Sequence, residues 1–222
     1  MSTTRGEPDV HDQYLPSIPA RVLAVGAHPD DLEIGCGGTL AKLRERGAMV
    51  RAVVLSQGRD GLPVGSNVDR LGETQAALSE LGIDDLVFAD FPDRHFGDHL
   101  NAIIEFLEEQ IAEFAPQRLY TMHGGDRHQD HRCVFEASQV AARCVAQVLL
   151  YETPSSSTDF APSYYEQIEA WLDAKLAALA AHESQAHRTY MHPDQARSQA
   201  VFRGRQAGCG PCEGYAVLKM VA

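Results

Sequence analysis

Two short segments of the chain concentrate side chains that can bind a metal ion. The first is His28-Pro29-Asp30-Asp31, and the second, His123 to His131, holds three histidines and two aspartates within nine residues. Imidazole nitrogens and carboxylate oxygens are common zinc ligands. His28, Asp31 and one histidine of the second segment would give three protein ligands and leave a fourth position open. That pattern is typical of catalytic zinc and not of structural zinc.

The adjacent carboxylates of the first segment indicate two different roles. Asp30 and Asp31 are like charges so close together that they need a nearby cation or separate functions. A metal ion satisfies this requirement if one aspartate binds it and the other stays free as a base. Pro29 disfavours the helical conformation at His28, so the chain leaves the preceding strand extended before it turns.

Each segment also has an interpretation without chemistry. His28-Pro29-Asp30-Asp31 alone is equally typical of a turn with capping aspartates, and the second segment alone is typical of a solvated polar loop. Both segments, however, follow predicted strands, and ligands of open α/β sheets bind at the carboxyl ends of strands. Together they favour a single metal site built from two loops. His123 is the histidine that we expect to be incidental.

Apolar runs alternate with helical periodicity through the first 151 residues. We expect strands at 21–26, 49–55, 85–89, 118–122 and 148–151, and helices at 39–46, 68–81, 100–114 and 132–146. This alternation predicts a single-domain α/β fold, a Rossmann-like three-layer sandwich with a mostly parallel sheet and helices on both faces. The site is expected at the carboxyl ends of the strands.

The two ends of the chain depart from this alternation. Residues 1–19 are polar and contain three prolines, so we expect a flexible leader before one domain over 20–222. After residue 151 we expect a loop at 152–162, a long helix at 164–182, a helix near 194–206 and a strand at 215–220. The loop is too long for a simple connection, so we expect 152–222 to shape a substrate cleft.

Composition excludes several classes of partner. The net charge of the 222-residue chain is -12, and a chain without a basic run is a poor ligand for nucleic acid or an anionic membrane surface. No stretch approaches the ~20 apolar residues that span a bilayer. The start lacks the basic and apolar parts of a secretory signal, so we expect a cytoplasmic protein. Five scattered cysteines do not indicate a disulfide framework.

Three further features invite a functional interpretation. Cys209-Gly210-Pro211-Cys212 matches a thioredoxin-type redox sequence, but a tight turn before the last strand is favoured, with a reversible disulfide as the alternative. Met191-His192-Pro193-Asp194 is typical of a turn that starts a helix, with proline in the first position. The Ala-rich helix around 174–181 is typical of internal packing or of a subunit contact, which leaves a homo-oligomer open.

The two metal-binding segments together resemble those of a known family. His-Pro-Asp-Asp-x-Glu after the first strand and His-x-Asp-His after a later strand are similar to the motifs of the LmbE-like, or PIG-L-type, zinc-dependent N-acetylglucosaminyl deacetylases. Gly37-Gly38-Thr39-Leu40 and Arg70-x-x-Glu73 add supporting matches. The resemblance covers residues 21–151 well and the last third only loosely.

The resemblance implies roles for individual residues. His28, Asp31 and His131 would bind Zn²⁺, and Asp30 would be the general base for a zinc-activated water and then protonate the leaving amine. His128 would stabilise the oxyanion. Asp130 would orient His128 and favour its charged form. Arg70 and Arg127 would contact the substrate.

The expected reaction is therefore removal of an N-acetyl or other acyl group from a small-molecule amino sugar or its conjugate. The sugar follows only from the resemblance. A zinc amidohydrolase acting on a non-sugar N-acyl conjugate and a non-catalytic, metal-containing carbohydrate-binding relative stay open. Gln129 stands where the family often has proline in its second motif, which affects the expected stiffness of the loop and the substrate preference but no ligand position.

Overall fold

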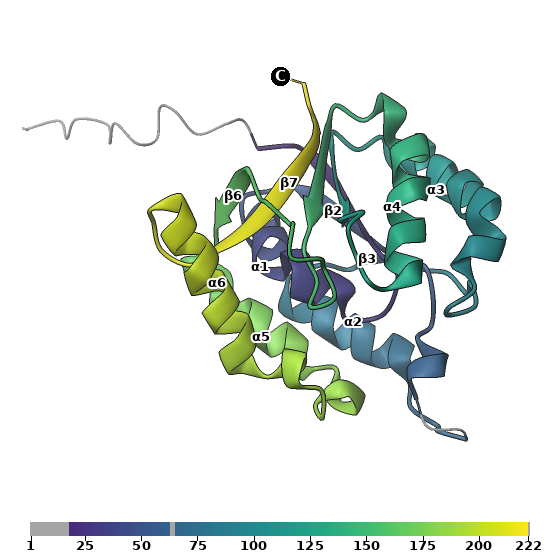
Figure 1. Ribbon diagram of the computed structural model, residues 1–222, viewed down its shortest axis with the longest axis horizontal. Coiled ribbons are helices and arrows are strands. Elements are labelled where there is room, and N and C mark those ends of the chain that lie inside the picture. Colours follow the sequence, from purple (N-terminus) through teal and green to yellow (C-terminus); the bar gives the residue numbers. More distant parts are fainter. Residues whose placement is uncertain (1–17, 63–64, 222) are drawn as a thin grey trace, which may run out of the picture.

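A computed structural model describes residues 18–62 and 65–221 of the chain. Seven strands form one sheet in the order β3-β2-β1-β4-β5-β7-β6. Strands β1 to β5 are parallel, whereas β7 runs antiparallel to both β5 and β6. Helices α3 and α4 lie on one face of the sheet, and α1, α2, α5 and α6 lie on the other (Figure 1). The predicted three-layer α/β domain is confirmed.

The strands and helices have the following bounds. The strands are β1 (Arg21–Gly26), β2 (Met49–Val54), β3 (Asp85–Phe88), β4 (Arg118–Met122), β5 (Gln147–Tyr151), β6 (Tyr164–Gln167) and β7 (Cys212–Met220). The helices are α1 (Asp31–Glu45), α2 (Arg70–Glu80), α3 (Leu100–Phe114), α4 (Gln129–Ala141), α5 (Leu172–Ala180) and α6 (Pro193–Ala207).

The strand order has a topological switch point between β1 and β4. The chain winds outward from β1 through β2 to β3, returns to β4, and continues to β5 on the other side. Loops that follow the two strands at such a point diverge to opposite faces and leave a crevice at the carboxyl edge of the sheet. The two metal-binding segments follow β1 and β4, so the fold places both of them at this crevice.

Burial explains why β1 can support the site rigidly. Its central residues Val22, Leu23, Ala24 and Val25 have no exposed surface, as expected for a parallel strand covered on both faces. Tyr151, at the end of β5, is also fully buried and donates its hydroxyl hydrogen to Val25 O at 2.8 Å.

The prediction of one helix over 164–182 is wrong. Residues Tyr164–Gln167 form the edge strand β6, which pairs antiparallel with β7, and α5 begins only at Leu172. Two consecutive tyrosines suit a pleated, half-buried surface, and β7 offers them backbone partners that a local pattern does not reveal. The Ala-rich segment itself is helical and packs against α1 and α2, so packing is confirmed for it.

Two helices begin earlier than expected, at the metal-binding segments themselves. Helix α1 starts at Asp31 and α4 at Gln129. His128 caps α4 because its Nδ1 accepts a hydrogen bond from the backbone N–H of Asp130 at 3.3 Å. The turn predicted at Met191-His192-Pro193-Asp194 is confirmed, since His192 caps α6 and Pro193 is its first residue.

The predicted leader over 1–19 lies almost entirely outside the described residues. Within 18–62 and 65–221, no helix has the length and apolar character needed to cross a membrane.

Candidate metal centre

The first metal-binding segment turns sharply between β1 and α1. Asp30 has φ 98°, a left-handed conformation that is rare for residues other than glycine. The backbone N–H of His28 donates to Asp31 Oδ2 at 2.7 Å, which closes the turn. This conformation separates the two neighbouring carboxylates, so that Asp31 faces the histidines and Asp30 does not share its ligand position.

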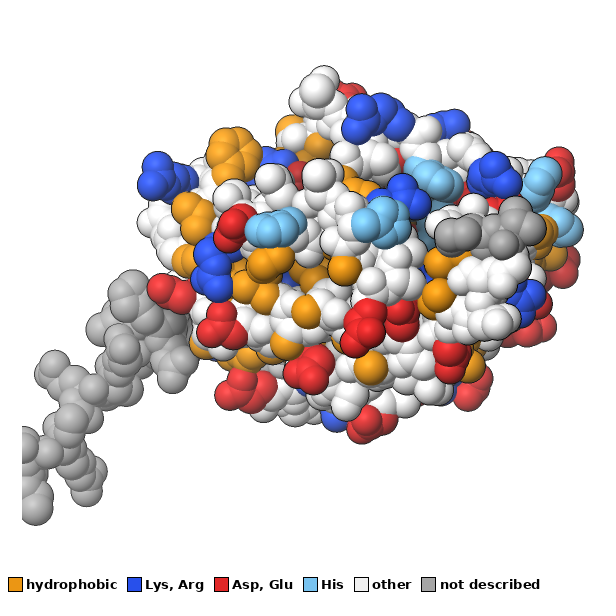
Figure 2. All heavy atoms as spheres, turned by 90° about the horizontal axis from the view of Figure 1, so that it is seen from below, with side chains coloured by type: hydrophobic (Ala, Val, Ile, Leu, Met, Phe, Trp, Pro, Cys, Tyr) orange, Lys and Arg blue, Asp and Glu red, His pale blue; other side chains and the backbone are white. Residues whose placement is uncertain are grey.

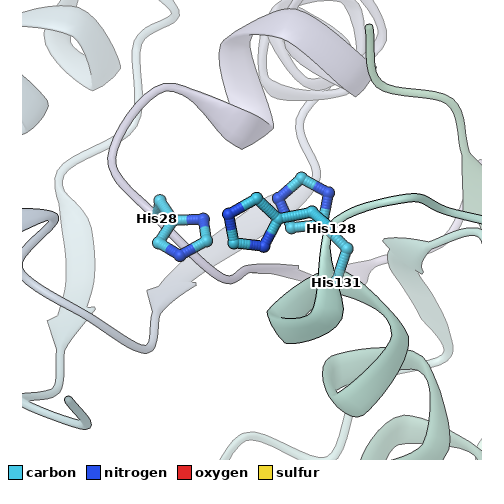
Figure 3. A group of neighbouring side chains, drawn as sticks. All are labelled: His28, His128 and His131. Atoms are coloured by element: carbon cyan, nitrogen blue, oxygen red, sulfur yellow. The ribbon is translucent and has the colours of Figure 1, made fainter. Parts of the chain in front are cut away.

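The second segment brings two imidazoles to the same place from the start of α4. Ring nitrogens of His28, His128 and His131 lie within 4.8 Å of one another. Figure 3 shows the three rings close together, with His28 from the loop after β1 and the other two from the start of α4. Asp31 lies between two of them: its Oδ1 is 3.4 Å from His131 Nε2 and its Oδ2 is 3.5 Å from His28 Nδ1. These four side chains form the candidate centre.

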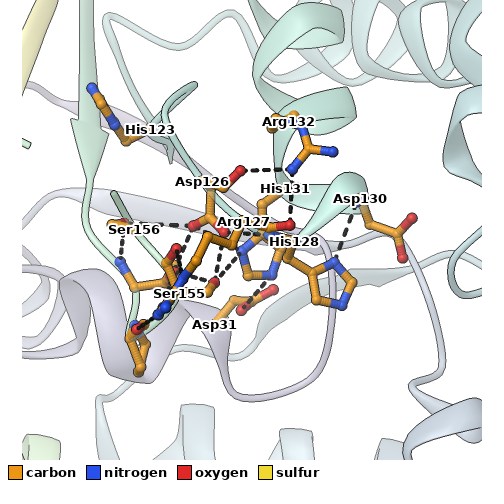
Figure 4. A network of polar contacts seen from close by, with 12 residues as sticks. Asp31, His123, Asp126, Arg127, His128, Asp130, His131, Arg132, Ser155 and Ser156 are labelled. Atoms are coloured by element: carbon orange, nitrogen blue, oxygen red, sulfur yellow. Dashed lines mark hydrogen bonds and ion pairs between the residues drawn. The ribbon is translucent and has the colours of Figure 1, made fainter. Parts of the chain in front are cut away.

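Carboxylates hold the outer nitrogens of two of these histidines. His28 Nε2 lies 3.0 Å from Asp130 Oδ2. His131 Nδ1 lies 3.1 Å from Asp126 Oδ2 (Figure 4). Metal-binding histidines almost always use their second nitrogen in this way, which fixes the tautomer and the ring orientation. The inner nitrogens, His28 Nδ1 and His131 Nε2, both face Asp31. The residues present therefore fit a metal ion held by His28, Asp31 and His131.

The electrostatics of the centre also favour a cation. Burial lowers the pKa of His28, but hydrogen bonds with Asp130 and Asp31 outweigh it and raise the pKa to about 10. Burial raises the pKa of Asp31, but the nearby charge of His131 and the contacts with His28 lower it to about 2. The carboxylates of Asp130 and Asp31 stabilise the charged form of His28, and the imidazoles of His131 and His28 stabilise the charged form of Asp31.

The pKa of Asp30 is shifted in the opposite direction from that of Asp31. Burial and the charge of Asp31 raise its pKa from 3.8 to about 7. The charges of His182 and Arg70 limit this increase in the pKa, and Arg70 Nη2 lies 3.7 Å from Asp30 Oδ2. A buried carboxyl group that takes and releases a proton near neutrality has the property required of a general base.

The centre opens into a cavity of about 430 Å³ at the carboxyl edge of the sheet. Segments from both halves of the chain line it, including Pro29, Gly58, Asp93, Arg94, Thr153, Ser155, Gln185 and Tyr190. The parallel strands run downward in Figure 1, so the view from below in Figure 2 faces this edge, and histidine and cationic side chains gather on its upper half.

Comparison with known proteins identifies the family to which this chain belongs. The family model described as "PIG-L: GlcNAc-PI de-N-acetylase" matches residues 23–142, more than half of the chain. This chain belongs to the PIG-L family. The resemblance inferred from the two motifs is thereby confirmed.

Individual proteins with similar sequences or structures agree with this family assignment. This PIG-L protein is 43% identical to the uncharacterized deacetylase YaiS of Escherichia coli (strain K12), over 73% of this chain and 90% of that one. It is 30% identical to 1D-myo-inositol 2-acetamido-2-deoxy-alpha-D-glucopyranoside deacetylase 1 of Saccharopolyspora erythraea, over 60% of this chain and 57% of that enzyme. The fold of the conserved protein TT1542 from Thermus thermophilus matches with TM-score 0.81 and 25% identity, over 90% of this chain and 96% of that one.

The structure of the PIG-L protein brings most of the predicted site residues together. His28, Asp30, Asp31, His128 and His131 line the cavity, and so does Arg70, which donates from Nη2 to Pro29 O at 2.8 Å. Arg127 is not among the residues that line the cavity, but it contacts two that are. It is exposed and donates to the backbone oxygens of Pro154 and Ser155, so it holds the loop after β5 against the second segment.

Asp130 has a different partner from the one expected. We predicted that its carboxylate orients His128, but it contacts His28, and only its backbone N–H reaches His128. The pKa of His128 is lowered, by burial and by the charges of His28 and His131. The charge of Asp130 acts on His128 in the expected direction, toward a higher pKa, but burial and the two neighbouring imidazoles outweigh it. His123, expected to be incidental, packs edge-on against Phe160.

Sequence reasoning missed Asp126 altogether. Its carboxylate contacts His131 and also accepts hydrogen bonds from the hydroxyls of Thr153 and Ser155, at 2.7 and 2.6 Å. An acidic residue within the histidine-rich segment was a signal for a supporting carboxylate. No comparable signal marked Gln185, Arg188 and Tyr190, which line the cavity from the segment between α5 and α6.

Proposed function

We propose that this PIG-L protein is a zinc-dependent N-deacetylase that removes an acetyl or other acyl group from an amino sugar or amino-sugar conjugate. The observation that carries the proposal is the division of roles between Asp30 and Asp31. The carboxylate of Asp31 faces two imidazoles, and its pKa is about 2. The carboxyl group of Asp30 faces Arg70, and its pKa is about 7. A hydrolase of this type needs one carboxylate as ligand and one as base.

His28, Asp31 and His131 are the residues that would hold the ion. Zinc, when bound, polarises the amide carbonyl and lowers the pKa of water, which an unactivated amide requires. Asp30 then takes a proton from the attacking water and returns it to the departing nitrogen, because a poor amine leaving group must be protonated to leave. Arg70 keeps the Asp30 carboxylate in place through its ion pair and its hydrogen bond to Pro29 O.

His128 stabilises the negative charge that develops on the carbonyl oxygen. Its lowered pKa makes it neutral at pH 7, and its Nδ1 accepts from the backbone of Asp130. The proton therefore resides on Nε2, which is free to donate a hydrogen bond. A preorganised donor beside a forming oxyanion contributes several kcal/mol, about 3 in comparable enzymes.

The names of the relatives support an amino-sugar substrate, since the Saccharopolyspora enzyme is named for an acetamido-sugar. The test combines metal analysis with acetate release from a panel of N-acetyl amino sugars and non-sugar N-acetyl compounds. We expect about one zinc per chain and release from amino sugars. Release from the non-sugar compounds alone would show another amidohydrolase, and a zinc-containing protein that releases nothing would show a non-catalytic relative.

Three variants separate the roles within the centre. Asp30→Asn should keep its zinc and lose turnover by about 10²–10⁴-fold, while His131→Ala should lose zinc. His128→Ala distinguishes two ligand sets, since its ring lies near those of His28 and His131. If His128→Ala loses zinc as His131→Ala does, His128 is a ligand and its role at the oxyanion is wrong.

A further inference from the structure

Two cysteines lie side by side in the turn that joins α6 to β7. Cys209 follows the carboxyl end of α6, and Cys212 is the first residue of β7. Both are free thiols, and their Sγ atoms are 3.2 Å apart. The sulfur atoms of a disulfide lie about 2.05 Å apart, so this pair is about 1 Å from bonding distance. The proposed deacetylase function uses neither residue.

Backbone contacts hold Cys209 in place from the helix side. Gly208 ends α6 in the left-handed conformation, with φ 76°, and the N–H of Cys209 donates to Gly204 O at 2.9 Å. These contacts are typical of the Schellman motif, which fixes the first residues after a helix. A Cβ on Gly204 would collide with Gly210 O, so the turn packs directly against the last turn of α6.

The sheet holds Cys212 from the other side. Cys212 lies opposite Gln167 of the edge strand β6, and the N–H of Ile168 donates to Pro211 O at 2.9 Å. The thiol of Cys212 also donates to Gly210 O at 3.3 Å. Because the backbone is fixed on both sides, the two thiols face each other before any bond forms, and joining them orders little further chain.

The two thiols differ in their access to solvent. Cys209 is exposed, whereas Cys212 is 1% exposed, so a reagent in solution can reach only Cys209. Burial and the hydrogen bond to Cys209 raise the pKa of Cys212 to about 12. Dithiols that pass their disulfide on to other proteins have a stabilised thiolate. Cys212 lacks that stabilisation, which favours a disulfide that stays on this chain.

We propose that Cys209 and Cys212 form a redox modification site, at which exchange with a low-molecular-weight disulfide makes a bond that joins α6 to β7. The thiolate of Cys209 attacks one sulfur of that disulfide, and one thiolate leaves. Cys212 then loses its proton to solvent, attacks the Cys209 sulfur and expels the second thiolate. The protein loses two S–H bonds and gains one S–S bond, while the reagent is reduced to two thiols.

The bond connects α6 to the helix that begins at the metal centre. Glu213, next to Cys212, accepts hydrogen bonds from the backbone N–H groups of Gly38 and Thr39 in α1, at 3.0 and 2.7 Å. Helix α1 begins at the proposed ligand Asp31. Helix α6 lies at the outer edge of its layer (Figure 1). The disulfide should therefore oppose local opening of α6 away from the sheet and slow hydrogen exchange in its last turn.

The first test follows the bond itself. The full chain is reduced, incubated with oxidised glutathione, unfolded in iodoacetamide and mapped by peptide mass. We expect Cys209 and Cys212 to escape alkylation together, in a peptide that is lighter by two hydrogens and carries no glutathione. Alkylation of both residues would overturn the proposal, and so would a glutathione adduct that persists on Cys209 of the unchanged protein.

Variants separate the two thiols. Cys212→Ser removes the second attack, so the mixed disulfide with glutathione should accumulate on Cys209. Cys209→Ser, at an exposed position, keeps the test decisive if Cys212→Ser loses stability, and its buried Cys212 should stay unmodified. Modification of Cys212 in that variant, as fast as the bond forms in the unchanged protein, would overturn the order of attack. Cys144→Ser is the matched control at another exposed cysteine, and it should form the bond at the unchanged rate.

Hydrogen exchange tests whether the bond holds α6 to the sheet. Amide exchange over residues 204–212 should be slower by about tenfold or more in the oxidised protein, because the bond restricts the opened state. Reduction with dithiothreitol should restore the faster exchange, and exchange in β1 should stay the same in both forms. Equal exchange over 204–212 in both forms would overturn the connection. Neither measurement requires turnover, so failure of the deacetylase proposal would leave this one standing.

Discussion

Asp130 Oδ2 lies 3.0 Å from His28 Nε2, although 102 residues separate the two in the chain. The same oxygen also accepts a hydrogen bond from the backbone N–H of Arg94 at 2.7 Å. Asp130 is fully buried, while His28 is partly exposed. The contact joins the loops after β1 and β4, so the second segment both contributes a proposed ligand, His131, and positions the ligand proposed in the first.

Replacing Asp130 tests this connection. We expect Asp130→Asn to lower zinc affinity by about 10–100-fold, because supporting carboxylates fix the orientation and basicity of a metal-binding histidine. Competition with a chromogenic chelator would measure the affinity. Asp98→Asn is the matched control, since that carboxylate is 80% exposed and contacts only an exposed histidine. Unchanged affinity in Asp130→Asn would remove Asp130 from its position behind His28.

The sequence was sufficient to place the metal-binding segments but not to pair their side chains. Strand and helix periodicity predicted β1 and β4, and the position of the motifs after these strands predicted their convergence. Asp130 was assigned to His128 from the resemblance of the second motif to that of the family. Its actual partner, His28, depends on how α4 is rotated against β1, and no local pattern carries that information.

The error over 164–182 has a similar origin. The Ala-rich periodic stretch at 174–181 follows Tyr164–Gln167 after only six residues, so the local pattern favoured one continuous helix. Strand β6 exists because β7 presents an unpaired edge to it, with Tyr164 opposite Tyr215 and Gln167 opposite Cys212. Partners of an edge strand lie far away in sequence and can override local propensity.

Two glycines of α1 should respond oppositely to substitution. A Cβ on Gly35 would lie 2.1 Å from the ring of Tyr151, which is fully buried, whereas a Cβ on Gly37 would meet no atom closer than 3.5 Å. We expect Gly35→Ala to destabilise the protein by about 1–3 kcal/mol. Gly37→Ala should be neutral or stabilise it by up to about 1 kcal/mol, through helix propensity. Urea denaturation would measure both, and equal stabilities would contradict the close packing of α1 on β5.

A buried ion pair behind Asp30 should make stability depend on pH. His182 Nε2 lies 3.3 Å from Glu33 Oε1, and neither side chain is exposed by more than 2%. Burial lowers the pKa of His182, but the charge of Glu33 outweighs it and the net pKa is raised. Because the folded pKa exceeds the unfolded value of about 6.5, the stabilisation is complete below that pH. It is lost as the pH rises through the folded pKa.

The variant His182→Gln should abolish this dependence. We expect it to lower the free energy of unfolding by about 3 kcal/mol at pH 6, because Glu33 is left buried without a cation, and by less at pH 9. Urea denaturation of the chelator-treated protein avoids a contribution from metal binding. His187→Gln, at an exposed position, is the control. A loss of equal size at both pH values would show that His182 contributes packing and not charge.

The cysteines should differ widely in reactivity. Burial, together with the hydrogen bond to Cys209, raises the pKa of Cys212 to about 12, and burial raises that of Cys36 well above its usual value. Cys209 follows the carboxyl end of α6, where no helix N-terminus stabilises a thiolate. We therefore expect iodoacetamide at pH 7.5 to alkylate the exposed Cys144 and to spare Cys36 and Cys212 until the protein unfolds. Peptide mass mapping would measure this, with Cys144→Ser as control. Alkylation of Cys212 as fast as Cys144 would instead indicate a reactive thiol, and would reopen the thioredoxin-type interpretation of this turn.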